Sequence, residues 1–427
     1  MGIRVYIKEN TDYYYPVRYV VKLIEKNQDI QIKFLDSPNL AKVIWDHSDE
    51  RSQPICLTFY KELASRQLNL VKNNCSSREP AIFDEKGNKD IAATIFYMVN
   101  CCQELNAEES TFDRYGRFKY EASYQYRFDR VEENLVQQEI DLFMKSYGLS
   151  TRQSKTTIFI SHDIDSIYGS FFQDGFWALK KMNPFVVLKL IVNELMKEHH
   201  WKNIDRVIKI NSEYDVYSTF FWLVNSGKSS DGIVNADYDL RKEQRLVNMV
   251  SSSGSYNGLH KSCGTMGIDE ELQRSNLKTT FNRYHFLKFR TWDDWPQIAK
   301  SQLQLDCSLG FAERYGFRNS YGKPFQPFDM NENKPFNFVE MPLHVMDTTL
   351  FGYMKVPVET IGERVIGFFE KHNYNCTLSL LWHNTSFTDY KFGPLLKEYK
   401  KIMGYLYECK IKASSPQEII AEGLINW

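Results

Sequence analysis

The feature that most constrains the fold is a regular alternation of short β-rich runs with longer helical runs after about residue 155. The β-rich runs are TTIFISHD (156–163), VYSTFFWLV (216–224), SYNGLH (255–260), RYHFLKF (283–289), LDCSLGF (305–311), FNFVEMPL (336–343) and CTLSLLWH (376–383). Between them lie segments with helical spacing of apolar residues, such as DLRKEQRLVNMVSS and VETIGERVIGFFEKH. Seven strands that alternate with helices predict an α/β fold with a parallel sheet, closed or nearly closed into a barrel. An open doubly wound sheet is the alternative, but no glycine-rich phosphate-binding motif follows any of the runs.

The first 150 residues have a mixed pattern. IRVYI and QIKFL are typical of strands, whereas YPVRYVVKLIEK, DIAATIFYMVNCCQEL and ENLVQQEIDLFMKSYGL have helical spacing. We therefore expect a small α/β domain at 1–150, a linker STRQSK, and the barrel at 155–427.

The overall composition excludes several classes of protein. Lys and Arg number 53 against 54 Asp and Glu, and no block of like charge stands out, so a nucleic-acid partner is not expected. The start, MGIRVYIKENTDYYY, lacks the apolar core of an export signal, which predicts a cytoplasmic protein. Eight scattered cysteines then predict reduced, buried thiols.

The most apolar stretch runs from Pro184 to Met196 and is too short to cross a bilayer, so no transmembrane segment is expected. A helix over 185–196 is expected to pack on the barrel, with a membrane surface as the alternative. The oligomeric state is left open.

The candidate chemistry lies where β-rich runs end, because barrel active sites gather at the carboxyl ends of the strands. Asp163 and Asp165 end the first run and share one side of it, since side chains alternate along a strand. His260, His285 and His383 belong to later runs. Carboxylates and imidazoles brought together in this way predict a site for a divalent ion, most simply zinc, with cobalt or iron as alternatives.

The order of SHDID, FFWLV, GLHKS, RYHFLKF, FRNSYGKPF and LLWH resembles the polysaccharide deacetylase family, carbohydrate esterase family four. The resemblance implies a distorted (β/α)7 barrel and metal-dependent removal of N- or O-acetyl groups from sugars. It also implies that Asp163 is the catalytic base, that Asp165 and His260 are metal ligands, that Arg283 orients the base, and that His383 is the general acid. The segment before the barrel resembles an N-terminal domain of unknown role found in some bacterial members.

One departure from the family pattern concerns the metal. A second histidine is expected four residues after His260, where this chain has Gly264. His285 is the candidate replacement, because it shares strand parity with Arg283, and Ser262 or a water molecule is the weaker alternative.

Other residues receive secondary roles. Arg318, in a Gly- and Pro-rich loop, and Trp382, which could stack on a sugar ring, are candidate substrate contacts. His162 has the opposite parity from the aspartates and is expected to pack behind the site. His344 and Asp347 could line the mouth of the barrel, without an assigned role.

The resulting hypothesis is a metal-dependent hydrolase that deacetylates a sugar or polysaccharide precursor in bacterial surface-carbohydrate metabolism. Two alternatives remain open. One is a carbohydrate-binding protein on a degenerate deacetylase barrel, and the other is a metal-dependent amidohydrolase that acts on a different C–N bond.

Overall fold

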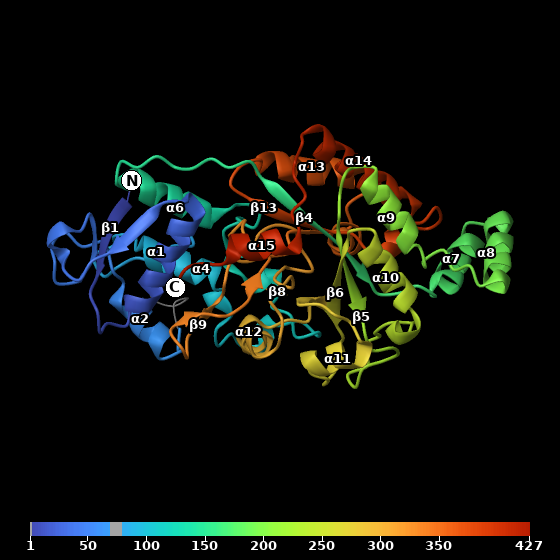
Figure 1. Cartoon of the computed structure of the whole chain (residues 1–427), viewed down its shortest axis with the longest axis horizontal. Helices are drawn as coiled ribbons and strands as arrows, with labels where there is room; N and C mark the ends of the chain where they lie inside the picture. The colour runs from blue at the N-terminus through green and yellow to red at the C-terminus, as the bar shows by residue number, and fades with distance from the viewer. Residues whose placement is uncertain (1, 69–78) are drawn as a thin grey trace.

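The computed structural model describes residues 2–68 and 79–427, so Cys75 lies outside the described residues. A large parallel sheet with its helices occupies the centre of the molecule, and a smaller α/β unit lies at one end (Figure 1). Both chain termini lie at this smaller unit. All of the described cysteines except Cys409 are buried.

The central sheet has eight strands in the order β11-β8-β7-β6-β5-β4-β13-β12, and every pair is parallel. Its strands are β4 (Thr157–Ile164), β5 (Thr219–Leu223), β6 (Tyr256–Lys261), β7 (Phe281–Tyr284), β8 (Leu305–Asp306), β11 (Val339–Glu340), β12 (Val345–Met346) and β13 (Thr377–Leu381). The predicted α/β class with a parallel sheet is confirmed, and each of the seven runs overlaps a strand, although β7 lies partly before RYHFLKF and ends at Tyr284. The eighth strand, β12, is too short to show a pattern in the sequence. Within the described residues no pairing joins the edge strands β11 and β12, so the barrel is open there.

Helices connect successive strands and cover the sheet (Figure 1). They are α7 (Ser170–Lys180), α8 (Pro184–Met196), α9 (Ile204–Ser212), α10 (Gln244–Ser252), α11 (Ile268–Ser275), α12 (Thr291–Lys300), α13 (Ile361–Lys371), α14 (Gly393–Glu408) and α15 (Pro416–Gly423). A short antiparallel pair, β9 (Phe328–Asp329) and β10 (Lys334–Pro335), lies toward the smaller unit.

Strand β4 lies between β13 and β5. The run TIFI is apolar throughout because helices and loops bury both faces of a parallel strand. The neighbouring strands are in parallel register with it, and Asp163 stands beside Phe221 of β5. The carboxyl ends of β4, β5, β6, β7 and β13 therefore meet at one edge of the sheet, which is where side chains from distant segments can converge.

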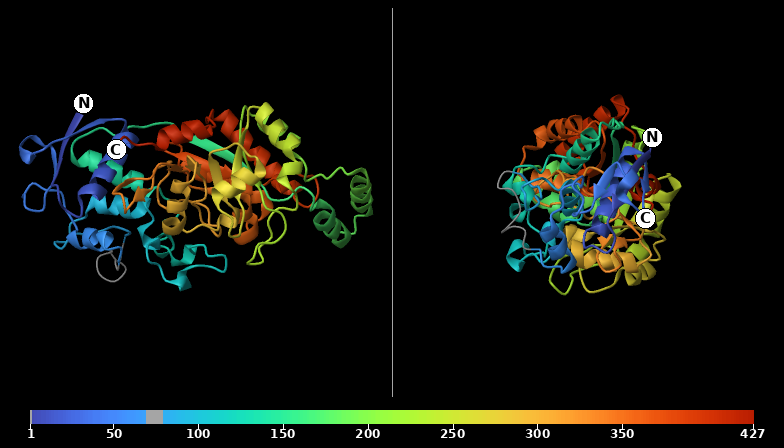
Figure 2. Two further views of the ribbon diagram at one scale, coloured as in Figure 1. Left: turned by 60° about the horizontal axis from the view of Figure 1, so that its bottom comes forward. Right: turned by 90° about the vertical axis from the view of Figure 1, so that its left-hand side faces the viewer.

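Helices α7 and α8 form a hairpin that projects away from the sheet, at the opposite end of the molecule from the smaller unit (Figures 1 and 2). The expectation that the helix over 185–196 packs on the barrel is wrong. Only Leu190 of α8 is buried, whereas Phe185 and Leu195 are 84% and 78% exposed. Within residues 2–68 and 79–427, none of the helices combines the length and apolar character needed to cross a bilayer.

The smaller unit contains a parallel three-stranded sheet in the order β2-β1-β3. Its elements are β1 (Gly2–Ile7), α1 (Tyr14–Gln28), β2 (Gln31–Phe34), β3 (Val43–Trp45), α2 (Leu57–Ala64), α4 (Ile91–Val99), α5 (Tyr124–Arg127) and α6 (Leu135–Ser146). Helix α1 buries Val17, Val20 and Ile24, which lie on one face at helical spacing. It ends at Asp29, whose backbone is left-handed at φ 54°.

The two units share one continuous hydrophobic core. The junction also contains a buried ion pair, in which Arg318 donates from Nε and Nη2 to the carboxylate of Glu104 at 2.9 and 2.7 Å. Arg318 is 1% exposed, so the prediction that it contacts a substrate is wrong. The part of its segment around Arg318 and Asn319 is buried against the smaller, N-terminal unit.

We expect Glu104→Gln to destabilise the protein strongly, because it leaves the Arg318 guanidinium buried without its counter-ion. Removing one partner of a buried pair costs about 3–5 kcal/mol of unfolding free energy. Urea denaturation followed by tryptophan fluorescence measures this loss. Glu109→Gln is the matched control, since Glu109 pairs with Arg290 at the surface, where such a pair contributes about 0–1 kcal/mol. Equal losses in the two variants would contradict the assigned role of the buried pair.

Candidate metal centre and active site

The carboxyl edge of the sheet brings together side chains from the ends of four strands. Asp163 comes from β4, His260 from β6 and Arg283 from β7. Asp165, His285 and His383 stand one or two residues beyond β4, β7 and β13. Residues that are far apart in the chain, from Asp163 to His383, therefore lie in one cluster at the strand ends.

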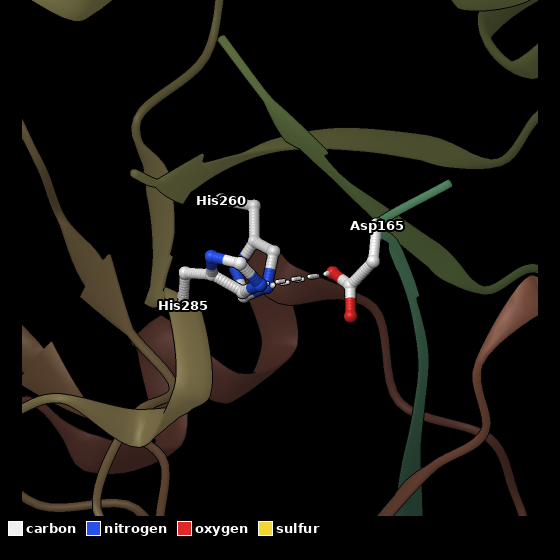
Figure 3. A group of neighbouring side chains, drawn as sticks. All are labelled: Asp165, His260 and His285. Carbon is white, nitrogen blue, oxygen red and sulfur yellow. Dashed lines mark ion pairs between the residues drawn. The ribbon is translucent and has the colours of Figure 1, made fainter. Parts of the chain in front are cut away.

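Asp165, His260 and His285 form the centre of this cluster. Each offers one ligand atom, and these atoms all lie within 4.8 Å of one another. His260 Nε2 is 3.3 Å and His285 Nε2 is 3.8 Å from Asp165 Oδ1. Figure 3 shows the two imidazoles side by side, both pointing toward the carboxylate. One carboxylate and two imidazoles leave a coordination position open, as in catalytic zinc sites.

Neighbouring groups orient both imidazoles. His260 Nδ1 donates to the Arg283 carbonyl at 2.9 Å, and His285 Nδ1 donates to Asn235 Oδ1 at 3.3 Å. Both acceptors are carbonyl oxygens, which cannot donate a hydrogen bond, so Nδ1 carries the proton when the ring is neutral. The unprotonated Nε2 of each ring then faces the centre. Asp165 Oδ1 is buried without a hydrogen-bond partner. Because buried polar atoms are normally satisfied, this donor set fits a bound cation.

The electrostatics of the three groups suit the same interpretation. Burial raises the pKa of the Asp165 carboxyl, but the nearby imidazoles outweigh burial and hold that pKa well below its ordinary value. Burial lowers the pKa of His285 to about 4, which keeps the ring neutral near pH 7. His260 differs, because the carboxylates of Asp163 and Asp165 outweigh burial and raise its pKa. A cation at the centre would replace the proton that His260 otherwise attracts.

Asp163 lies beside the donor trio but is held by a different partner. Arg283 Nη1 donates to Asp163 Oδ1 at 2.7 Å, and Asp163 Oδ2 lies 3.5 Å from His260 Nε2. The Arg283 guanidinium is fully buried and lies 4.5 Å above the ring of Phe221. Gly258 makes room for that ring, because a Cβ there would lie 2.5 Å from it. Packing from three strands thus fixes one carboxylate oxygen and leaves the other facing the centre.

His383 lies on the Asp165 side of the cluster, with Nε2 3.6 Å from Asp165 Oδ2. Its Nδ1 contacts Asp347 Oδ1 at 2.6 Å, and its backbone N–H donates to Asp347 Oδ2 at 3.0 Å. Ser386 and the Thr348 backbone also donate to Asp347. Burial opposes protonation of His383, but Asp347 outweighs it and raises the pKa of His383 to about 10. The ring is therefore a protonated group with a free Nε2–H directed at the site.

A cavity of about 260 Å³ opens over these residues. Aromatic side chains contribute much of its wall, namely Trp201, Phe286, Tyr353 and Phe392. Arg117 of the N-terminal unit also lines it, donating from Nη1 to the Phe286 carbonyl and to the Tyr353 hydroxyl. The N-terminal unit therefore supplies part of the site wall.

Several residues chosen from sequence lie elsewhere. The expected substrate contact at Trp382 is contradicted, since its side chain is fully buried and packs against Tyr399. Gly264 and Ser262 line a neighbouring cavity, and the Ser262 hydroxyl accepts a hydrogen bond from the Asn225 backbone. Neither belongs to the donor trio.

The two remaining histidines near the sheet are both buried. His162 packs away from the site, with Nδ1 2.7 Å from the Trp382 carbonyl and Nε2 2.9 Å from Asn211 Nδ2. His344 bonds to Ser379 and does not line the site cavity, which differs from the expectation that it could line the mouth.

Sequence reasoning missed three supporting residues. Asn235 and Arg117 lie in loops without apolar periodicity, and nothing in the surrounding residues indicates a partner. Asp347 was noticed without a role, and its contact with His383 depends on β12 pairing with β13. A two-residue strand leaves no recognisable signal, so that pairing could not be foreseen.

The fold and the site together define a parallel α/β barrel protein with a candidate Asp/His/His metal centre at the carboxyl edge of its sheet. In the comparisons with known proteins, residues 3–148 match the model of a family of unknown function (DUF7033). No curated protein matches the sequence.

Solved structures resemble the chain distantly. A "putative polysaccharide deacetylase" from Mycobacterium smegmatis is 12% identical with a TM-score of 0.39, covering 63% of this chain and 89% of its own. A CE4 family pseudoenzyme from Bacillus anthracis is 11% identical with a TM-score of 0.32, covering 64% and 68%. A peptidoglycan N-acetylglucosamine deacetylase is 12% identical with a TM-score of 0.31, covering 62% and 87%. Likeness at this level assigns no activity, which has to be argued from this chain's own side chains.

We expect the purified protein to bind about one equivalent of zinc and His285→Ala to bind much less, because that variant lacks one of three donors. Asn235→Ala should weaken zinc binding about 10–100-fold, since it removes the group that orients His285. Elemental analysis and competition with a chelator measure both effects, and the exposed His47 provides the control His47→Ala. Wild-type protein that stays metal-free after loading would contradict the metal centre and favour a binding module.

Proposed function

We propose that the protein is a metal-dependent hydrolase that removes an acetyl group, most simply from the nitrogen of an N-acetylated sugar. The proposal rests on one observation. Three side chains that could bind a metal ion lie beside two groups that could transfer protons, Asp163 and His383. Asp163 is fixed by Arg283, and His383 is fixed by Asp347, and each lies within 3.6 Å of a member of the trio.

Asp165, His260 and His285 would hold the ion, for which zinc is the simplest choice. When bound, zinc would supply Lewis acidity toward the acyl carbonyl and toward an attacking water. His285 occupies the role left vacant by Gly264, so a second imidazole ligand comes from β7 and not from the segment after β6.

Asp163 is the proposed general base. Its Oδ1 is engaged by Arg283, while Oδ2 faces the centre, where it can accept a proton from the attacking water. Arg283 acts through Asp163 and is a positioning residue. Because the guanidinium is itself clamped by Phe221 and the Cys307 carbonyl, the carboxylate has little freedom to turn away.

His383 is the proposed general acid. Its Nδ1 proton is held by Asp347, so Nε2–H is the proton available to the departing amine. Asp347 therefore does for His383 what Arg283 does for Asp163, since each fixes one side of a reacting group and leaves the other side free.

The cavity supports a sugar as substrate. About 260 Å³ lies just below the roughly 300–1,000 Å³ typical of small-molecule sites, which suits an acetyl group and part of one sugar ring. Tyr353 and Phe392, which are not fully buried, offer aromatic faces of the kind against which sugar rings stack. These rings replace Trp382 as candidate substrate contacts.

Asp163→Asn should keep its zinc and lose acetate release by roughly 10²–10⁴-fold, because the amide cannot take a proton from water. Acetate release from a panel of N- and O-acetylated sugars, with zinc content measured on the same sample, tests this. Asp36→Asn on the exposed surface of the N-terminal unit is the control. Unchanged turnover would remove Asp163 as the base, and turnover of small cyclic amides in place of acetylated sugars would reassign the substrate.

Asp347→Asn should lower kcat by about 10²-fold or more with little change in KM, since the substrate does not contact Asp347. The carboxylate accepts hydrogen bonds at both oxygens, and an amide would set its –NH₂ group against a donor. His383 would then lose its fixed orientation and the negative charge that raises its pKa. Steady-state kinetics and zinc analysis check the expectation, and a rise in KM with kcat preserved would contradict it.

A further inference from the structure

The α7–α8 hairpin projects from the rest of the molecule (Figures 1 and 2), and both of its helices expose large apolar side chains to solvent. Those that are at least 42% exposed are Phe172, Phe176, Leu179, Met182, Phe185, Leu188, Ile191, Val192, Leu195 and Met196. Met182 and Phe185, at the turn between the helices, are 88% and 84% exposed. Solvent-exposed apolar groups in such number mark a surface that is covered in the working state.

Helix α8 is apolar around most of its circumference, not along one stripe. It contacts α7 and buries Leu190, while Leu188, Ile191 and Leu195 are exposed. A helix of this kind is stable when an apolar medium surrounds it. A flat protein partner would cover one side, whereas the edge of a bilayer can surround the whole tip.

The charged side chains at the turn of the hairpin are basic, whereas Asp174 and Glu194 toward its base pair with His200 and His199. From Gly175 to Asn193 the sequence contains Lys180, Lys181 and Lys189 and no acidic residue. Lys180 and Lys181 are exposed and flank the turn. Lysines beside exposed apolar side chains are the combination by which surface helices bind bilayers containing anionic lipids.

We propose that the tip of the α7–α8 hairpin docks into the headgroup region of an anionic bilayer. At about 1.5 Å per residue, the 13 residues of α8 extend about 20 Å, less than the roughly 30 Å of a hydrocarbon core. The hairpin therefore enters one leaflet and does not cross. The apolar side chains at the turn enter the lipid, and Lys180 and Lys181 contact the phosphate groups.

Docking would affect the site, because the base of the hairpin forms part of the wall of the site cavity. Gln173 of α7 and Trp201, which follows α8, line the site cavity, and Asp174 is bonded to His200 across the base of the hairpin. A docked tip would hold the cavity close to the membrane surface. This step rests on the proposed function. The substrate class that fits is an acetylated sugar attached to a lipid.

The test is co-sedimentation of the full-length protein with vesicles of phosphatidylglycerol and phosphatidylcholine. The triple variant Met182→Ser, Phe185→Ser, Leu188→Ser should bind at least about 10-fold more weakly than wild type, since it removes apolar groups that enter the lipid. The matched control replaces three exposed apolar residues elsewhere, Leu40→Ser, Tyr126→Ser and Tyr407→Ser, and should bind like wild type. Lys180→Glu with Lys181→Glu should abolish the preference for anionic vesicles.

Equal binding of the hairpin and control variants, or no vesicle binding by wild type, would overturn the proposal. A wild-type protein that is dimeric in light scattering, with a monomeric hairpin variant, would also overturn it, because the hairpin would then contact a second copy of the chain. Asp163→Asn separates docking from chemistry and should bind vesicles like wild type while releasing no acetate. Docking that fails while a water-soluble acetylated sugar is still deacetylated would refute only the membrane inference.

Discussion

The site depends on how the negative charges of two neighbouring carboxylates at the end of one strand are balanced by different partners. Asp163, near the end of β4, and Asp165, directly after it, line the same cavity, where their two negative charges repel each other. Asp163 is compensated by the Arg283 guanidinium, whereas Asp165 faces only imidazoles. One carboxylate therefore has a permanent cation, and the other is left to attract an exchangeable one. This asymmetry separates a group that can act as a base from a group that can act as a ligand.

Both halves of the chain contribute to that arrangement. Arg117 of the N-terminal unit donates to the carbonyl of Phe286, the residue directly after His285, and Phe286 has a left-handed backbone at φ 58°. A non-glycine residue held in that conformation needs support from its surroundings. Tyr115 adds to that support by stacking on the Phe286 ring, with centroids 5.5 Å apart. The N-terminal unit thus stabilises the loop that presents His285.

The parts of the site that could be predicted are those that follow from strand periodicity. Alternation places Asp163 and Asp165 on one side, and it places His162 on the other, where the structure has it. The same rule, applied to β13, would have excluded Trp382, because its neighbour His383 faces the site. Burial of Arg318 could not be foreseen in this way, since it depends on Glu104 from a unit whose position no local pattern encodes.

The α7–α8 hairpin shows that apolar periodicity predicts a helix but does not predict whether that helix is buried inside the protein. A helix that packs on a barrel needs one apolar stripe, and the residues of α8 provide apolar groups on nearly every side. An all-round apolar helix of 13 residues has two ways to be buried, either inside a large core or in lipid. The structure leaves only Leu190 of α8 buried, and a short segment that begins with Asp165 joins β4 to the hairpin. Because the exposed α7–α8 hairpin follows Asp165 closely in the chain, the surface that we propose binds lipid is connected directly to the candidate metal site.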